Sequence, residues 1–305
     1  MQKRGKRSSL NRRYGVAGLC FLLPALLVYL AFVVIPFFDS FSLSFFQWNG
    51  FSARSFVGTN NYLNALSDKV FLLAIRNSVY LGITSSIISV IVGVLLAWFL
   101  LYVGRRWGAM YRTILFSPSM IPAVITALVF AFIYEPENGA LNAMLNMFRY
   151  LFGVPPAQIA WLTNKATALG SILFVSAWKQ VGLTMVLCFA GMQGLNLSLV
   201  ESARLDGAGD FQVFRRIILP LIMPFVQLSA IFALMSGLKI YDTVVALTGG
   251  GPAKATTVMP LWILQNSFSF NKYGYGAAMS MIFVLIVLVG MILVKRMIKG
   301  ESYEQ

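Results

Sequence analysis

The sequence predicts an all-α membrane protein with six transmembrane helices and with its N and C termini in the cytoplasm. Three observations support this fold class. Of the 305 residues, 58% are hydrophobic and only 11% are charged, whereas a soluble globular domain carries about 25% charged residues. The apolar residues are collected into six long runs, and lysine and arginine are concentrated in alternate connections between the runs. A chain of this length with so few polar residues could not cover an aqueous surface.

Each of the six runs is long enough to cross a bilayer. A hydrocarbon core of about 30 Å takes roughly 20 helical residues. Backbone amides in lipid must be bonded within their own segment, which excludes isolated strands. Five runs contain no charged residue, and the other is interrupted only by Lys179. In chain order the runs are Gly15–Phe38, Asn77–Gly104, Thr113–Tyr134, Ala166–Val200, Ile217–Leu238 and Tyr273–Val294.

The distribution of basic residues predicts the orientation. With the N-terminus inside, the inside segments hold 15 lysines and arginines and the outside segments hold 8, as the positive-inside rule requires. The first run is longer than a signal-peptide core and no small-x-small cleavage site follows it, so we expect a retained helix. The predicted layout is a basic cytoplasmic N-terminus (1–14), a six-span domain (15–294) and a cytoplasmic tail (295–305), with periplasmic segments at about 39–76, 135–165 and 243–272 and a cytoplasmic loop at 193–216.

Charge and residue usage exclude several functions. The positive-inside bias explains the net charge of +14 without nucleic acid, and we expect the basic N-terminus to anchor to anionic lipid headgroups. The chain has no histidine, so imidazole catalysis and histidine-ligated metals are excluded. Cys20 and Cys188 both fall in apolar runs, which indicates small core residues and neither a disulfide nor a metal site.

The outside segments contain local signals of their own. Leu63, Leu66 and Val70 recur at helical spacing, which predicts an amphipathic helix at the membrane interface. A short helix is expected around Leu141–Phe152. Three glycines before a proline, at 249–252, predict a turn or irregular loop.

The inside loop at 193–216 predicts a short helix, a glycine turn and a second helix. Ser198 and Glu201 match a capping box, and Gly207 can end the first helix in a left-handed conformation. Asp210 can cap the second helix, which then runs into the fifth span. Pro220 and Pro224 are expected to kink that span.

The same loop carries a recognisable motif. Glu201-Ser202-Ala203 is followed by Asp206, Gly207 and Ala208, and then by Ile218-Leu219-Pro220. This spacing resembles the EAA motif of ABC importer permeases; the one departure in the triplet is Ser202, which is also small. The resemblance implies that an ATPase subunit is contacted through a coupling helix and turn containing Glu201, Ser202, Ala203, Asp206, Gly207 and Ala208.

Other elements narrow the resemblance to the sugar-permease family typified by the maltose and glycerol-phosphate systems. They are Phe56-Val57-Gly58 with Asn61-Tyr62, Ser117-Pro118 with Ile121-Pro122-Ala123, Trp178-Lys179-Gln180, and Thr248-Gly249-Gly250-Gly251-Pro252. The likeness extends from about Gly15 to Val294. The last element resembles the maltose-type first permease subunit, although this chain lacks that protein's extra N-terminal spans and large periplasmic insertion.

The resemblance implies a type I importer in the inner membrane of a bacterium or archaeon. A second homologous permease subunit would complete a heterodimer, two copies of an ATPase subunit would drive it, and an extracytoplasmic solute-binding protein would deliver a saccharide. The chain has no G-x-x-x-x-G-K-[ST] loop for ATP phosphates. We therefore expect a non-catalytic subunit without a cofactor of its own, with Mg-ATP bound by the ATPase.

The resemblance also implies a substrate path at mid-membrane on the fourth and fifth spans. Lys179 would cost about 2.5–3.5 kcal/mol on insertion scales, so it should face a cavity or a partner. Two alternatives remain open for it: a donor to the saccharide, which would favour an anionic one, or an ion pair with Asp242. Three consecutive residues cannot all face one cavity at 3.6 residues per turn. The candidate residues are Ser176, Trp178, Lys179, Gln180, Ser236, Gly237 and Ile240.

Two other functional classes compete with this prediction. A secondary transporter or channel needs coupling or gating groups at mid-depth, where the sequence offers Lys179 without an embedded acid pair. An intramembrane enzyme needs a nucleophile paired with a base, and none is evident. Among ABC importers, a permease for another polar solute such as glycerol phosphate is the closest alternative.

Overall fold

The computed structural model describes residues 21–298 of the chain. The expected basic segment 1–14 and residues 299–305 of the expected tail lie outside the described residues. The chain divides into two compact units: residues up to Ala65 with Asn266–Met281, and Leu66–Gln265 with the residues after Met281.

The first unit contains an apolar helix and a small hairpin. The helix Phe21–Leu43 includes a π-helical turn, η1 (Leu30–Val34), and ends as α2 (Ile35–Leu43). Strands β1 (Phe46–Gln47) and β2 (Ser55–Phe56) pair antiparallel. The helix α3 (Asn60–Ser67) follows, and η3 (Gln265–Ser269) and α15 (Tyr273–Met297) begin the C-terminal part.

The F-x-G-x-x-N-Y element closes this hairpin. The Asn61 side-chain amide donates to the carbonyl oxygens of Ser44 and Phe46, both at 2.9 Å. The hydroxyls of Tyr62 and Ser44 lie 2.6 Å apart, and Gly58 has a φ of +57°, which favours glycine. These contacts give the element a structural role.

The second unit is a bundle of helices. Its start corrects one expectation: Val70 does not belong to the interfacial helix, because α3 ends at Ser67 and the Asp68 carboxylate caps a new helix by accepting from the amide of Val70 at 2.8 Å. The helices are α4 (Lys69–Tyr102), α5 (Arg105–Met120), α6 (Ala123–Ile133), α7 (Ala140–Leu151), α8 (Ala168–Gln193), α9 (Leu197–Leu205), α10 (Asp210–Val213), η2 (Phe214–Ile218), α11 (Leu219–Leu221), α12 (Met223–Leu238), α13 (Asp242–Thr248) and α14 (Met259–Leu264). The short helix expected near Leu141–Phe152 is confirmed as α7.

The all-α, multi-span part of the predicted fold class is confirmed, and the cytoplasmic position of the termini stays a prediction. Four described helices are long and apolar enough to cross a membrane, and two bent helix pairs bring the number to six if each pair is one span. The third span is not a single helix, because α5 and α6 meet at 96°. The fifth span is bent by 72° before α12, which confirms the kink expected near Pro220 and Pro224.

Small residues allow the long helices to approach closely. A Cβ atom on Gly237 of α12 would lie 2.7 Å from the Cα of Gly82 in α4. A Cβ on Gly93 of α4 would lie 2.7 Å from side-chain atoms of Thr184 in α8, whose hydroxyl is 2.8 Å from that of Ser89. Such contacts are typical of helix packing in membranes, where small residues let backbones meet.

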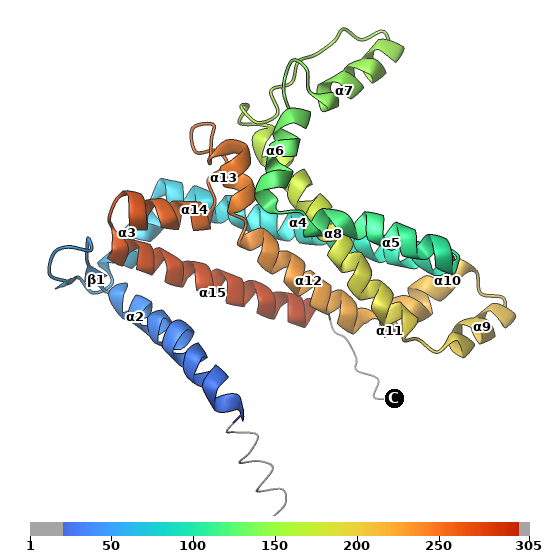
Figure 1. The fold of residues 1–305 in the computed structure, drawn as a ribbon, viewed down its shortest axis with the longest axis horizontal. Helices are drawn as coiled ribbons and strands as arrows, with labels where there is room; N and C mark the ends of the chain where they lie inside the picture. The colour runs from blue at the N-terminus through green and yellow to red at the C-terminus, as the bar shows by residue number, and fades with distance from the viewer. Residues whose placement is uncertain (1–20, 299–305) are drawn as a thin grey trace, which may run out of the picture. The chain divides into compact units, whose positions relative to one another are not determined.

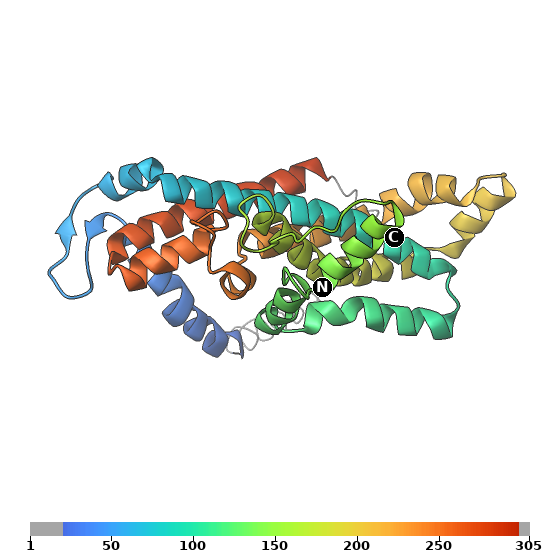
Figure 2. The ribbon, with the colours of Figure 1, turned by 90° about the horizontal axis from the view of Figure 1, so that it is seen from above.

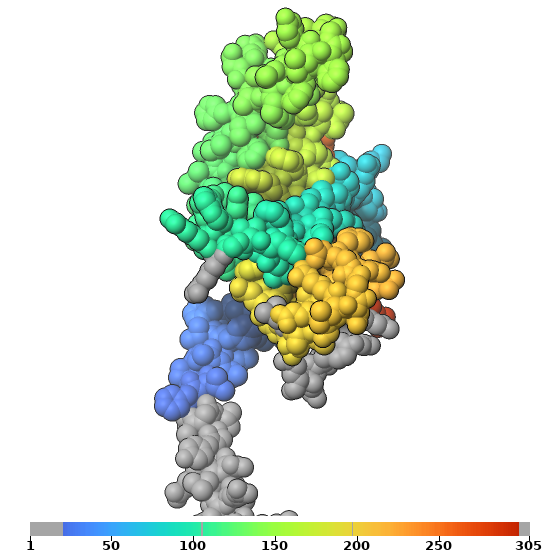
Figure 3. Space-filling view, turned by 90° about the vertical axis from the view of Figure 1, so that its right-hand side faces the viewer, coloured from blue at the N-terminus to red at the C-terminus, as the bar shows by residue number. Residues whose placement is uncertain are grey.

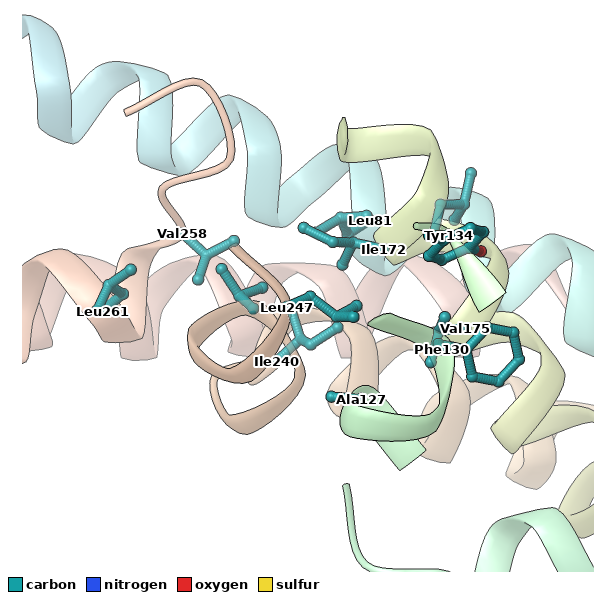
Figure 4. Close-up of a cluster of buried hydrophobic side chains, with 12 residues drawn as sticks. Leu81, Ala127, Phe130, Tyr134, Ile172, Val175, Ile240, Leu247, Val258 and Leu261 are labelled. Carbon is teal, nitrogen blue, oxygen red and sulfur yellow. The ribbon is translucent and has the colours of Figure 1, made fainter. Parts of the chain in front are cut away.

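One core cluster of the second unit joins α4, α6, α8, α13, α14 and the loop before α14. Figure 4 shows this cluster, in which Leu81, Ile172 and Val175 are fully buried beside residues of α6 and α13. The loop at 249–258 is held by the Asn77 side chain, which donates to the carbonyls of Ala255 and Thr257, both at 2.9 Å. The expected irregular loop is therefore ordered by α4.

Candidate functional site

The EAA-like loop, residues 193–216, forms a short helix, a turn and a second helix, as predicted. In Figures 1 and 2, α9 and α10 lie at the end of the unit where α4 terminates at Tyr102. The capping-box prediction is wrong: Asn196 is the N-cap, and its side chain accepts from the amide of Ser198 at 3.1 Å. An earlier start places Glu201 beyond the first turn, where it is exposed.

Gly207 ends α9 as expected. It has a φ of +85°, and the amide of Ala208 donates to the carbonyl of Ala203 at 3.0 Å while that of Gly207 donates to Arg204 at 3.0 Å. This pair of bonds is a Schellman motif, which satisfies the last carbonyls of a helix. Apart from Gly207 and its two chain neighbours, no atom of the described residues lies within 4 Å of the position that a Cβ on Gly207 would take, so the backbone conformation, not crowding, favours glycine there.

An ion pair joins the two helices of the loop. The prediction that Asp210 caps the second helix is wrong, because Gly209 is the N-cap and Asp210 is the first helical residue. Its carboxylate accepts a 2.8 Å bond from the Arg204 guanidinium. This hydrogen bond raises the pKa of Arg204 above its ordinary value, so the guanidinium keeps its charge at every physiological pH.

Aromatic contacts connect the loop to α4. Trp98 stacks on Phe214 with ring centroids 4.5 Å apart, and Arg204 lies over the ring of Tyr102 at 5.9 Å. Phe214 and Val213 are buried in the core. The loop is therefore packed against α4 and leads directly into the start of the fifth span.

The outer face of the loop is exposed. Figure 3 faces this end of the unit and shows the α9–α10 segment, in gold, at the surface. Leu205 on α9 is 89% exposed. Of the candidate coupling residues, Glu201, Ser202, Asp206 and Gly207 are exposed and Ala203 and Ala208 are half-buried.

A polar cavity of about 260 Å³ lies between α8, the start of α6 and the connection from α12 to α13. The structure brings five of the seven predicted substrate-path residues to its walls: Ser176, Lys179, Gln180, Ser236 and Ile240. A second cavity of about 160 Å³ continues along α8 and α12. Lys179, Gln180 and Ser236 line both cavities.

The other two predicted residues lie elsewhere. Trp178 packs edge-on against Phe130, with ring centroids 5.3 Å apart, and does not line either cavity. Gly237 is buried against Gly82 and Ser85 of α4. Trp178 thus packs on α6 while it is 37% exposed, and Gly237 packs on α4.

The ammonium of Lys179 donates a 2.6 Å hydrogen bond to the carbonyl oxygen of Ile121. Ile121 lies at the break between α5 and α6, where Pro122 supplies no amide hydrogen. Asp242, the expected ion-pair partner, lines the same cavity, but the ion pair found within 4 Å among the described residues is that of Arg204 and Asp210. The contact is instead of the kind that lysine in a membrane span commonly makes, to a backbone carbonyl.

Half of the wall of the first cavity is not apparent from the sequence. Lys239 falls in an expected outside segment because it follows the last apolar residue of its run, and Asp242 is expected only as a partner of Lys179. The break that follows α12 turns both back toward α8. The residues missed are Ala123, Lys239, Tyr241, Asp242 and Thr243.

Apolar spans, a cavity between them with polar side chains in its wall, and an exposed helix–turn–helix loop beyond the end of α8 together indicate a membrane transport component. The chain belongs to the family of binding-protein-dependent transport system inner membrane components, which residues 89–301 match. It is thus an inner-membrane permease component of an ABC transporter, and its six-span prediction agrees with that class.

Named relatives and a solved structure agree with this assignment. The chain is 36% identical to the "Probable ABC transporter permease protein YurN" of Bacillus subtilis (strain 168), over 88% of this chain and 91% of that protein. It is 32% identical to the diacetylchitobiose uptake system permease protein NgcF of Streptomyces coelicolor, over 89% of this chain and 79% of that protein. A chain of a bacterial ABC transporter that imports the acidic polysaccharide alginate has the same type I permease fold. The two structures match with a TM-score of 0.78 and 23% sequence identity, over 95% of this chain and 98% of that chain.

Proposed function

We propose that the chain is one of two permease subunits of an ATP-driven importer for a saccharide, in particular an oligosaccharide. The observation that carries this proposal is the cavity lined by Ser176, Gln180 and Ser236. Hydroxyl and amide side chains both donate and accept hydrogen bonds, and so they suit a solute rich in hydroxyl groups. The names of a diacetylchitobiose permease and of an alginate importer among similar proteins support the same solute class.

The complete transporter would contain three further kinds of subunit. A second, homologous permease forms a heterodimer with this chain and closes the path. Two ATPase subunits bind Mg-ATP, and an extracytoplasmic binding protein delivers the saccharide. This chain then has no catalytic residue and no cofactor of its own.

Coupling would pass through the EAA-like loop. Glu201, Ser202 and Leu205 are exposed on α9, where they can lie in a groove of the ATPase. Rigid-body closure of the ATPase pair moves such a helix as a unit. The stacked pair of Trp98 and Phe214 then transmits the movement to α4 and the bent fifth span.

This assignment sets the orientation in the membrane. The loop at 193–216 and both termini lie in the cytoplasm, and the segments at about 39–76, 135–165 and 243–272 lie outside. Lipid surrounds the apolar faces that the partner permease leaves uncovered.

Reconstitution tests the proposal. The chain is co-expressed with the permease, ATPase and binding protein encoded beside it, and the complex is placed in liposomes with ATP supplied to the ATPase side. We expect uptake of a neutral or acidic oligosaccharide that requires both ATP and the binding protein. Uptake that persists without the ATPase subunit would contradict the proposal and favour a secondary transporter.

One observation favours a second candidate solute. Lys179 and Lys239 both line the cavity, with Asp242 as the single acid among its described lining residues. Two ammonium groups against one carboxylate favour an anion, such as glycerol phosphate. Competition by glycerol phosphate in the uptake assay distinguishes this candidate from a saccharide.

A further inference from the structure

A third cavity, of about 380 Å³, lies between α6, the start of α7, the connection at 161–167 and the start of α8. It shares no lining residue with either of the two polar cavities. Its wall is mainly apolar and includes Phe130, Ile133, Leu141 and Phe174. Phe174 is 58% exposed, so the cavity opens to the surface of the chain.

The polar side chains in this wall already donate their hydrogen bonds within the chain. The Tyr134 hydroxyl donates to the carbonyl of Ser171 at 3.2 Å, and the Ser171 hydroxyl donates to the carbonyl of Thr167 at 3.1 Å. The Thr167 hydroxyl donates to the carbonyl of Trp161 at 2.9 Å, and the Trp161 ring nitrogen donates to the Asn142 side chain at 2.9 Å. Apolar cavities stay dry and bind apolar molecules. The wall therefore suits a hydrocarbon group and not a saccharide.

The rim of this apolar cavity is basic. Lys165 is exposed and directly precedes Ala166, which lines the cavity. Among the described residues, no carboxylate lies within 4 Å of the Lys165 ammonium. The acid nearest to the lining residues in sequence is Glu135, and its carboxylate accepts from the amide of Asn138 in the turn after α6. The Lys165 ammonium is thus available to an anion from outside the chain.

The cavity lies at one end of the fourth span. Its wall includes Gly170, Ser171 and Phe174 from the first two turns of α8, which begins at Ala168. The preceding segment, 135–165, is predicted to lie outside the membrane, so the rim is at the level of the outer lipid headgroups. Tryptophan and tyrosine are enriched at this level in membrane proteins, and one of each lines the cavity.

We propose that the cavity binds one acyl chain of a phospholipid whose phosphate lies at the ammonium of Lys165. A phospholipid supplies both required parts, a hydrocarbon chain for the cavity and an anion for the ammonium. Free phosphate would supply only the second part. This inference is independent of the solute that the importer carries.

Photolabelling of the assembled complex tests the proposal. The complex is reconstituted in phosphatidylcholine vesicles that contain a trace of phosphatidylglycerol with a diazirine near the end of one acyl chain. After irradiation, the labelled peptides are identified by mass spectrometry. We expect the label to concentrate in segments 130–141 and 166–174. Lys165→Gln should lower the yield in these segments roughly fivefold, because it removes one basic group from an anionic lipid.

Two variants fill the cavity. Outside the backbone of its own helix, no described residue has an atom within 4 Å of a Cβ on Gly170, so Gly170→Trp can place its ring in the cavity. Ala166→Trp does the same from the rim. Both should abolish the excess label in the two segments.

Two further variants are matched controls. Ala190→Trp introduces the same ring at an exposed position of α8 that does not line the cavity. Lys272→Gln neutralises another exposed lysine in a segment predicted to lie outside. Both should keep the wild-type label in segments 130–141 and 166–174.

Two results would overturn the inference. The first is a label spread evenly over exposed apolar residues such as Ile87 and Ile91 of α4, which are 53% and 56% exposed, because bulk lipid alone gives this pattern. The second is capture of another subunit of the complex as the main product of a photoreactive amino acid at position 174, because a protein then covers the cavity. If both tryptophan variants fail to assemble, the wild type and Lys165→Gln still decide. Uptake is measured separately, so either result leaves the proposed importer function standing.

Discussion

The ammonium of Lys179 in α8 lies 2.6 Å from the carbonyl oxygen of Ile121, at the break between α5 and α6. A second backbone carbonyl nearby is also bonded by a side chain. Pro118 has no N–H group to donate to the carbonyl of Ile114, and the Ser117 hydroxyl donates to that oxygen at 2.9 Å instead. Side chains commonly satisfy the backbone groups that proline frees in membrane helices. The third span is therefore a bent element that depends on a neighbouring helix.

The first prediction concerns this bond. Lys179→Met should lower the yield and melting temperature of the purified complex, because a hydrogen bond to a charged group contributes about 1.5–3 kcal/mol. Lys179→Arg should restore most of the loss, since arginine keeps a donor at this depth. Asp242→Asn is the matched control and should keep the wild-type melting temperature. Equal losses for Lys179→Met and Asp242→Asn would instead support the predicted ion pair.

The second prediction concerns the turn of the EAA-like loop. Gly207→Glu should leave the protein inserted but abolish solute-stimulated ATP hydrolysis in the assembled complex. A side chain at a φ of +85° costs about 1–2 kcal/mol, and the new carboxylate lies where the ATPase is proposed to dock. Gly209→Glu is the control, because Gly209 has a φ of −70° that any residue adopts. Near-normal uptake by Gly207→Glu at normal expression would count against the coupling role.

The third prediction separates packing from solute contact in the fifth span. Gly237→Ala should destabilise the complex by about 1–3 kcal/mol, because its Cβ would lie 2.7 Å from the Cα of Gly82. Gly170→Ala should be tolerated, since outside the backbone of its own helix no described residue has an atom within 4 Å of a Cβ there. Melting temperatures of the purified variants check both. An altered saccharide preference with unchanged stability in Gly237→Ala would restore this residue to the substrate path.

The fourth prediction concerns topology. In a variant without Cys20 and Cys188, a cysteine at Gly207 should not react with a membrane-impermeant maleimide in intact cells. A cysteine at Tyr150, which is 84% exposed on α7, should react. External labelling at Gly207 would refute the cytoplasmic position of the EAA-like loop.

The fifth prediction concerns pH. The hydrogen bond from Arg204 to Asp210 raises the pKa of Arg204. The charge of Arg204 therefore stabilises the folded loop fully at any pH below the ordinary pKa of arginine. This stabilisation is lost only when the pH rises through the still higher pKa that Arg204 has in the folded protein. Arg204 should therefore add no pH dependence to coupled ATP hydrolysis between about pH 6 and pH 9. Comparison of the pH profiles of the wild type and Arg204→Gln checks this. A difference in the shape of the profiles would contradict it.

The sequence alone determined the class of the protein. Long uncharged runs can be satisfied only as helices in lipid, and their positions predicted the spans to within several residues at most ends. Gly207 and the residues around it predicted the helix–turn–helix, because a left-handed turn depends on local backbone chemistry. The motif at 201–220 predicted the family because all of its residues lie in one continuous segment, where their spacing can be read directly from the sequence.

Only the tertiary structure decided the roles of single residues in the spans. Residues 178–180 are adjacent in sequence, yet Trp178 packs on Phe130, Lys179 bonds to Ile121 and Gln180 faces the cavities. The hydrogen-bond partner of Lys179 is the backbone oxygen of Ile121, 58 residues away in the sequence. This oxygen lies at the break between α5 and α6, and no local sequence pattern specifies the angle of that break. Gly237 and Ser236 likewise separate because one faces α4 and the other the cavity. Which face of an apolar helix meets a neighbour depends on how the helices cross, and a uniformly apolar segment carries no periodic signal from which to predict it.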